Sequence, residues 1–304
     1  MLAFVAARVG QALLTLLASS VIVFALVRTS GSPVDLILPP DSTPAERQAA
    51  IRRLGLDRPL SYQYGAFLWN ALQGDWGTSL RTGRPATELV KERLANSLKL
   101  ATAAIGITLL LSIPLGVLAA VNRAGPWDRL GMAFAVLGQS LPAFWLGIIL
   151  MLVFAVWLRW LPTSGMESWR HYVLPAVVLG WGISAGVVRL LRSSMLEVLD
   201  SEFVKLARTK GLSEARVVWK HALRNALLPV ITFAGFMYGV IIAAAIVVEV
   251  VFSWPGLGRL AYESTLWRDF PVLQLTVLTW TALVIAINFL VDVSYGLVDP
   301  RVRR

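Results

Sequence analysis

Long blocks without a charged residue constrain this chain more than any other feature. They are residues 9–27, 100–122, 130–158, 172–188, 225–248 and 270–291. A helix rises about 1.5 Å per residue, so about 20 apolar residues cross a hydrocarbon layer of about 30 Å. Only 15% of all residues are charged, against about 25% in a typical soluble protein. The sequence therefore predicts an all-α membrane protein with six transmembrane helices.

Two blocks need separate interpretation. Residues 9–27 follow a basic residue and could be a secretory signal, but the run is longer than a typical signal core and no A-x-A-like site follows it. A span is favoured. Residues 172–188 form the shortest block and carry Pro175, so this span is the least secure. Pro114 and Pro142 lie inside their blocks and predict kinks.

The basic residues are distributed in a way that indicates membrane orientation. The net charge is +10 and the isoelectric point about 10.5, which could suggest nucleic-acid binding. The arginines and lysines instead gather in the short segments 122–129 and 189–224 and in the tail 297–304. The positive-inside rule places such segments on the cytoplasmic side. We therefore expect both termini in the cytoplasm and no nucleic-acid partner.

The polar segment 29–95 separates the helix of residues 1–28 from the rest, and we expect it to be a small external subdomain between the first two spans. Its aromatic residues fit either a compact core or an interfacial belt. Within it, residues 85–99 predict an amphipathic helix that lies along the outer surface and leads into the second span. The remaining spans belong to a core of residues 96–296.

Residues 200–229 carry helix-capping signals inside a basic loop. Ser201 can cap a short helix over residues 202–209, and Gly211 can supply the left-handed residue that ends it. Ser213 can cap a second helix that runs toward Pro229. The segment is thus expected to fold as helix, tight turn, helix.

A helix of two turns is marginal in water, so an exposed one needs a partner surface. Phe203, Leu206 and Ala207 offer apolar contacts for such a partner. The alternative is a basic loop attracted to anionic lipid. The capping residues and the glycine favour a shaped docking element.

Several strings in the chain resemble one family. The runs A-R-T-K-G-L-S and H-A-L-R-N-A-L-L-P, at residues 207–213 and 221–229, resemble the cytoplasmic loop of binding-protein-dependent ABC importer permeases. They are most similar to the dipeptide, oligopeptide and nickel branch. The wider family begins this loop with Glu-Ala-Ala, where this chain has Lys205-Leu206-Ala207. Further similar strings are L-G-L-D-R-P at 54–59, G-D-W-G at 74–77, I-P-L-G at 113–116, L-P-A-F at 141–144, E-V-V-F-S-W-P-G-L-G at 249–258 and V-D-P-R at 298–301.

The resemblance implies a type I ABC importer permease fold in a bacterial or archaeal cytoplasmic membrane. It implies a second homologous permease, one or two cytoplasmic ATP-binding subunits and an external solute-binding protein as partners. The cargo would be di- or oligopeptides, with nickel or another small solute as the alternative. A coupling loop at about 200–222 would dock on the ATP-binding subunit, and residues 249–258 would form an external gate or contact the binding protein.

The resemblance carries specific residues onto these two segments. The expected coupling residues are Glu202, Phe203, Leu206, Ala207, Arg208, Lys210, Gly211, Leu212 and His221. The expected gate residues are Glu249, Trp254, Pro255, Gly256 and Gly258.

The residues argue against catalysis on this chain. No G-x-x-x-x-G-K-[ST] string occurs, so ATP and magnesium are expected on partner subunits, with no cofactor or metal here. Residues 182–186 match the G-x-S-x-G nucleophile motif, but they lie inside a predicted span and far along the helix from His171. The same glycines suit helix packing, as does the pair Gly235 and Gly239.

The rival function is an energy-independent transporter or channel. Such proteins carry ionisable residues at the bilayer midplane or paired broken helices. The sequence shows neither clearly, although Asp292, near the inner end of the last span, could line a path or pair with the basic tail.

Overall fold

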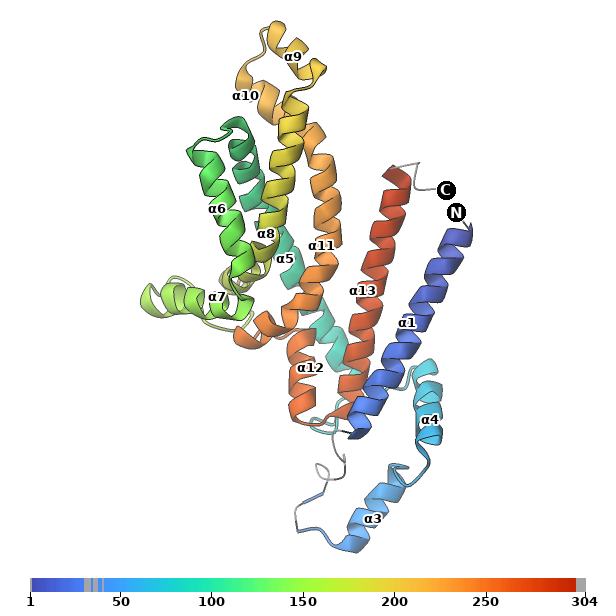
Figure 1. Cartoon of the computed structure of the whole chain (residues 1–304). Helices are drawn as coiled ribbons and strands as arrows, with labels where there is room; N and C mark the ends of the chain where they lie inside the picture. The colour runs from blue at the N-terminus through green and yellow to red at the C-terminus, as the bar shows by residue number, and fades with distance from the viewer. Residues whose placement is uncertain (1, 30–33, 35–37, 40, 299–304) are drawn as a thin grey trace. The chain divides into compact units, whose positions relative to one another are not determined.

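The structure, a computed structural model, describes residues 2–29, 34, 38, 39 and 41–298, with side chains described only between residues 8 and 290. Over these residues the fold is helical without a strand, and Thr78 and Pro85 form an isolated antiparallel bridge. The helices (Figure 1) are α1 Leu2–Thr29, α3 Pro44–Arg53, α4 Leu60–Leu72, α5 Ala86–Val121, α6 Pro126–Ser140, α7 Ala143–Leu150, η1 Met151–Trp157, α8 Trp169–Leu199, α9 Glu202–Thr209, α10 Glu214–Arg216, η2 Val217–Ala222, α11 Leu223–Val251, α12 Leu257–Leu266 and α13 Phe270–Val298.

Five continuous helical stretches of the described residues are long and apolar enough to cross a membrane. They are Arg8–Thr29, Ala86–Val121, Trp169–Leu199, Glu214–Val251 and Phe270–Leu290. The least secure predicted span, 172–188, is thus part of a helix of 31 residues. The membrane prediction and the all-helical fold are confirmed.

The block 130–158 differs from the single kinked span that the sequence predicts. It forms two helical pieces, Pro126–Ser140 and Ala143–Trp157, that meet at 109° and make a broken span or a re-entrant loop. The cause is local, because Leu141 precedes Pro142 and takes an extended backbone with ψ 127°. Proline disfavours the helical conformation in the residue before it and cannot donate a backbone hydrogen bond.

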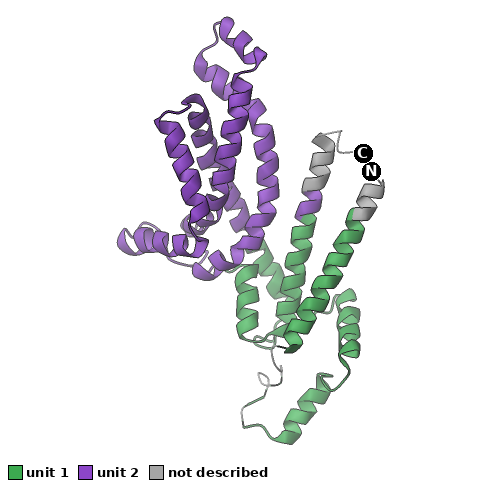
Figure 2. Cartoon of the chain, viewed as in Figure 1, with its two compact units in different colours: residues 1–96, 255–286 green, residues 97–254, 287–304 purple. Residues whose placement is uncertain are grey.

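The chain folds as two compact units (Figure 2). The first unit is residues 1–96 with 255–286, and the second is residues 97–254 with 287–304. Each is described here by itself.

The first unit has an apolar core built around the start of α5. Leu89 and Val90 of α5 pack in one buried cluster with α12 and the beginning of α13. The residues 85–99, predicted as an amphipathic helix that leads into the second span, form the first turns of α5 and pass into the span without a break. Burial of Leu89 and Val90 explains the continuity, since the helix is held by packing from its first turns.

The aromatic residues between α1 and α5 divide between two environments. Tyr64 and Phe67 of α4 contact the ring of Phe24 in α1, with centroids 5.3 and 6.0 Å away. Tyr62 and Trp69 of the same helix are more than 60% exposed. Neither α3 nor α4 buries a residue. The two described helices α3 and α4 therefore form no core of their own, and the inward rings of α4 pack on α1.

The second unit is organised around α8, which packs against α6, α7 and α11. Glycines permit close approach at several points. A Cβ at Gly186 would lie 2.8 Å from the ring of Phe233, and one at Gly116 would lie 3.0 Å from Leu191. The predicted packing role of residues 182–186 is confirmed at Gly186. Ser184, which lies between Gly182 and Gly186, is buried. Its hydroxyl donates to the carbonyl of Gly180, one helical turn earlier, as serines in helices commonly do.

An ion pair joins α6 to α8 within the second unit. Nε and Nη2 of Arg192 donate to the two oxygens of Asp128 at 2.7 and 2.8 Å. The same carboxylate accepts the amide of Ala124, whose φ is +60°. Asp128 therefore fixes the turn between α5 and α6 as well as the α6–α8 contact, and no local sequence pattern predicted this pair.

Replacing Arg192 with methionine is expected to lower the free energy of unfolding of the second unit by about 1–3 kcal/mol, since a largely buried carboxylate loses its charged donor. Thermal unfolding of the protein in detergent measures the change. The matched control is Arg189→Met, which removes an exposed contact to the neutral side chain of Gln139. Equal unfolding temperatures for the two variants would contradict the assignment.

Candidate functional site

The predicted coupling loop contains a short helix just beyond the end of α8. α8 ends at Leu199 and α9 spans Glu202–Thr209, the bounds that the sequence predicts, with Ser201 as the N-cap. Figure 1 shows α9 and α10 together beyond the end of α8. The Ser201 hydroxyl bonds backward to the carbonyl of Val198, so the predicted side-chain cap on α9 is wrong. The backbone carbonyl of Ser201 instead accepts the amides of Val204 and Lys205.

The turn after α9 depends on Gly211. Its φ is +75°, in the left-handed region, as the sequence predicts. The amide of Gly211 donates to the carbonyl of Arg208 at 2.9 Å, and the amide of Leu212 donates to the carbonyl of Ala207 at 3.3 Å. This pair of hydrogen bonds is the Schellman motif that ends many helices. The turn is therefore closed by backbone geometry.

An ion pair fastens α9 to the element that follows it. The Arg208 guanidinium donates to both oxygens of Glu214, at 3.1 and 2.7 Å. The carboxylate raises the pKa of Arg208 above its usual value, so the pair stays charged. Because both side chains are about half exposed, the pair adds little stability, and it serves mainly to fix orientation. Ser213 begins α10 without a side-chain cap, and Pro229 lies inside α11 instead of ending a helix.

Val204 anchors α9 to the rest of the second unit. Its side chain is fully buried, and α9 packs against η2 and α8. Val217 and Val218 of η2 are buried as well. Sequence reasoning missed Val204, because α9 has apolar residues on two faces and only the position of η2 decides which face turns inward.

The opposite face of α9 presents apolar side chains to solvent. Phe203 is 46% exposed and Leu206 55% exposed, one helical turn apart. Lys205 lies between them in the sequence and pairs with Glu202 at 2.8 Å. We call Phe203, Leu206 and their flanking ion pair the outer face of α9. The remaining predicted coupling residues surround it: Ala207, Leu212 and His221 are half-buried, and Arg208, Lys210 and Gly211 are exposed.

The predicted gate residues fall in both units. In the second unit, Glu249 is fully buried in α11 and accepts the hydroxyl of Ser97 in α5. Trp254 is also fully buried, with its ring edge-on to Tyr172 at 4.6 Å between centroids. The two residues are thus held by packing and hydrogen bonding inside that unit.

In the first unit, Gly256 is the N-cap of α12 and Gly258 is buried in its first turn. The carbonyl of Pro255 accepts the side-chain amide of Asn96 at 2.9 Å. The side chain of Asp292 lies outside the described residues. Among the described side chains, no three histidine, aspartate or glutamate residues are placed to hold a metal ion.

Comparison with known proteins agrees with this architecture. Residues 112–304 match the family described as "Binding-protein-dependent transport system inner membrane component". The chain is 42% identical over 304 residues to the glutathione transport system permease protein GsiC of Salmonella paratyphi A, covering 100% of this chain and 99% of the relative. It is 41% identical over 304 residues to GsiC of Escherichia coli K12, with the same coverage.

The fold resembles a solved structure described as inward-facing conformations of the MetNI methionine ABC transporter. The TM-score is 0.59 at 19% identity, over 70% of this chain and 97% of that chain. At such low identity the likeness shows a shared fold alone. The family match spans more than half of the sequence and the identity to GsiC extends over its whole length, so the chain belongs to the family of binding-protein-dependent transport system inner membrane components, the permeases of ABC importers.

Proposed function

We propose that this permease moves peptides across the bacterial inner membrane and takes its power from an ATP-binding subunit that docks on α9. A second, homologous permease would complete the passage, and an external solute-binding protein would deliver the cargo. The observation that carries the proposal is the outer face of α9, where Phe203 and Leu206 are exposed on a helix fixed by Val204. Apolar side chains held in water by a rigid support are typical of an interaction surface.

The contacts of α9 provide a mechanical route for the partner's motion. α9 packs on both α8 and η2, and η2 continues directly into α11. A rigid displacement of α9 therefore pulls on two long helices of the same unit. Nucleotide-driven closure of the partner would reach the spans in this way, as in other domain-closure transitions.

The cargo is inferred from relatives. The relatives are named as glutathione transport permeases, and glutathione is a tripeptide. This favours peptides over nickel for the present chain. Uptake of radiolabelled glutathione, a dipeptide and nickel by proteoliposomes containing the whole complex, with each tested as a competitor of the others, decides between these cargoes.

The proposed orientation can be tested by labelling, because the chain has no cysteine. A single cysteine at Lys210, in the exposed turn after α9, is expected to react with a membrane-impermeant maleimide only after the cells are opened. A single cysteine at Arg53, in exposed α3, is expected to react in intact spheroplasts. The opposite pattern would place α9 outside and remove the docking proposal.

Gly211→Val is expected to abolish co-purification of the ATP-binding subunit while leaving membrane insertion intact. A Cβ at Gly211 would meet nothing within 4 Å, so the penalty is the positive φ alone. A β-branched residue there costs about 1–3 kcal/mol, enough to undo the turn. Gly211→Asn is the control, since asparagine tolerates this conformation and should keep the subunit bound. Normal co-purification with Gly211→Val would count against the proposal.

The double variant Phe203→Ser, Leu206→Ser is expected to weaken ATP-binding subunit affinity by about tenfold or more, with the unfolding temperature unchanged. Burying the exposed half of each side chain in an interface contributes about 1 kcal/mol. Affinity is measured by titrating the subunit onto the permease pair in nanodiscs. Tyr62→Ser removes an equally exposed ring from α4 and should have no effect. An unchanged affinity in the double variant would show that the outer face does not dock.

A further inference from the structure

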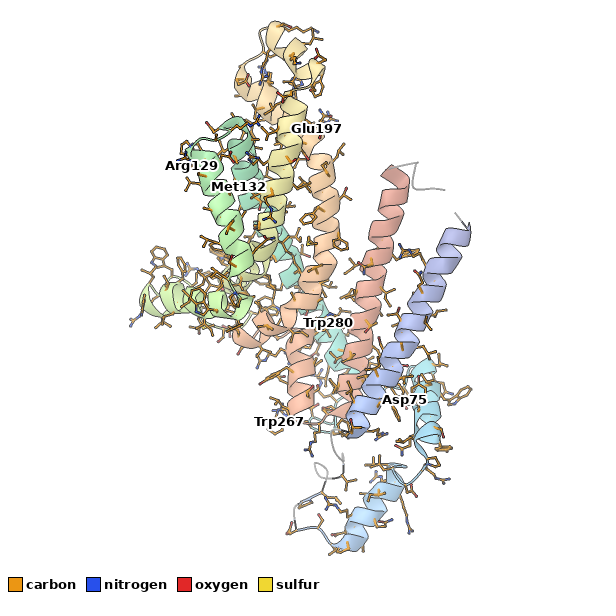
Figure 3. The ribbon with its side chains drawn as sticks, in the orientation of Figure 1. Asp75, Arg129, Met132, Glu197, Trp267 and Trp280 are labelled. Carbon is orange, nitrogen blue, oxygen red and sulfur yellow. The ribbon has the colours of Figure 1, made fainter. Side chains whose placement is uncertain are left out.

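A cavity of about 400 Å³ lies in the first unit, between the Ser79–Thr82 turn, α5, α12 and the start of α13. Its floor is apolar, with Leu89, Leu260 and Val272 all buried. Its rim carries Arg81, Arg93 and Trp267. Figure 3 shows Trp267 at the end of α12. Nothing in the coupling mechanism uses this cavity.

Neither of the two rim arginines forms a close ion pair with a described carboxylate, although Arg93 acts electrostatically on Glu92, its neighbour in the sequence. Arg81 lies over the ring of Trp267, 4.5 Å from its centroid, and makes no ion pair there. Arg93, half-buried on α5, likewise makes no ion pair with any described carboxylate. We call this cavity and its two arginines the Arg81–Arg93 pocket.

The acidic residues that line the pocket are already engaged. Asp269 is 5% exposed and accepts the hydroxyl of Ser79 and the amide of Leu80. Glu263 accepts Nε of Arg259 at 2.7 Å. The lining itself holds two arginines and two carboxylates, and Arg259, which pairs with Glu263 from outside the lining, brings the formal charge of this group to +1.

We infer that the Arg81–Arg93 pocket receives an acidic side chain of the solute-binding protein. The inference rests on the proposed function, which places this segment on the external side of the membrane. Guanidinium groups bind carboxylates through paired, charge-assisted hydrogen bonds, and arginine beside tryptophan is typical of the residues that dominate interfaces.

The geometry favours a projecting side chain over a whole solute. Trp267 is 49% exposed, and Arg81 is exposed at the rim. Pockets for small molecules bury most of the ligand surface. A cavity of about 400 Å³ with an apolar floor and two arginines at its edge has room for one carboxylate side chain, whose own backbone stays on the partner.

The test uses the complete transporter in nanodiscs, with both permeases and the ATP-binding subunits, and its solute-binding protein. Arg81→Gln and Arg93→Gln are each expected to raise the dissociation constant of the binding protein about tenfold, and to flatten its dependence on salt. Arg93→Lys should recover part of the lost affinity, since lysine restores the positive charge but not the planar guanidinium that binds a carboxylate through two hydrogen bonds. Lys91→Gln, which removes an exposed charge from the same helix outside the pocket, should change affinity less than twofold.

Two results would overturn the inference. One is a double variant, Arg81→Gln with Arg93→Gln, that binds within twofold of the unaltered complex while its unfolding temperature is normal. The other is an unchanged docking constant with a raised KM for peptide uptake, which would assign the pocket to solute. Failure of the proposed function is distinct, because the unaltered complex would then lack the ATP-binding subunit or show no ATPase stimulation by the binding protein.

Discussion

The bilayer leaves no water to satisfy backbone N–H and C=O groups, and this constraint shapes most of the structure. Each long apolar stretch of the chain responds by closing its hydrogen bonds within a helix. The exception is the break at Leu141 and Pro142, where a single proline converts one apolar block into two helices at 109°. Irregular backbone at such depth is tolerated only where protein or water covers it. Beside the break, Gly138 lies directly against Trp181 of α8, and a Cβ at Gly147 would lie 3.2 Å from the ring of Phe252, so both pieces pack closely on protein.

Stability and recognition are assigned to different residues in the coupling loop. Backbone hydrogen bonds at Gly211 and burial of Val204 hold α9 in place. Phe203 and Leu206 make no comparable internal contribution, since about half of each side chain is exposed. A helix of eight residues would fray in water by itself, so the Schellman turn and the contact with η2 are what allow it to present an apolar surface.

The sequence predicted those features that depend on local chemistry. Helix α9 has the expected bounds and Gly211 the expected positive φ, because such preferences act over a few residues, but the predicted Ser201 side-chain cap does not form. Ion pairing between Asp128 and Arg192 was beyond such reasoning, since the two residues are 64 positions apart. The burial of Val204 could not be predicted from the local sequence either, because it depends on where η2 packs. The proline at 142 predicts an interruption, but the angle of 109° between the two pieces does not follow from the local sequence.

The division of α9 into a buried side and an exposed side has an evolutionary meaning. Val204 is buried and supports the permease's own fold, so substitutions there would be selected against whichever ATP-binding subunit the permease uses. Under the proposed function, Phe203 and Leu206 contact a surface encoded by another gene. These two positions would then be free to change together with that gene, while the buried side of the helix stays the same.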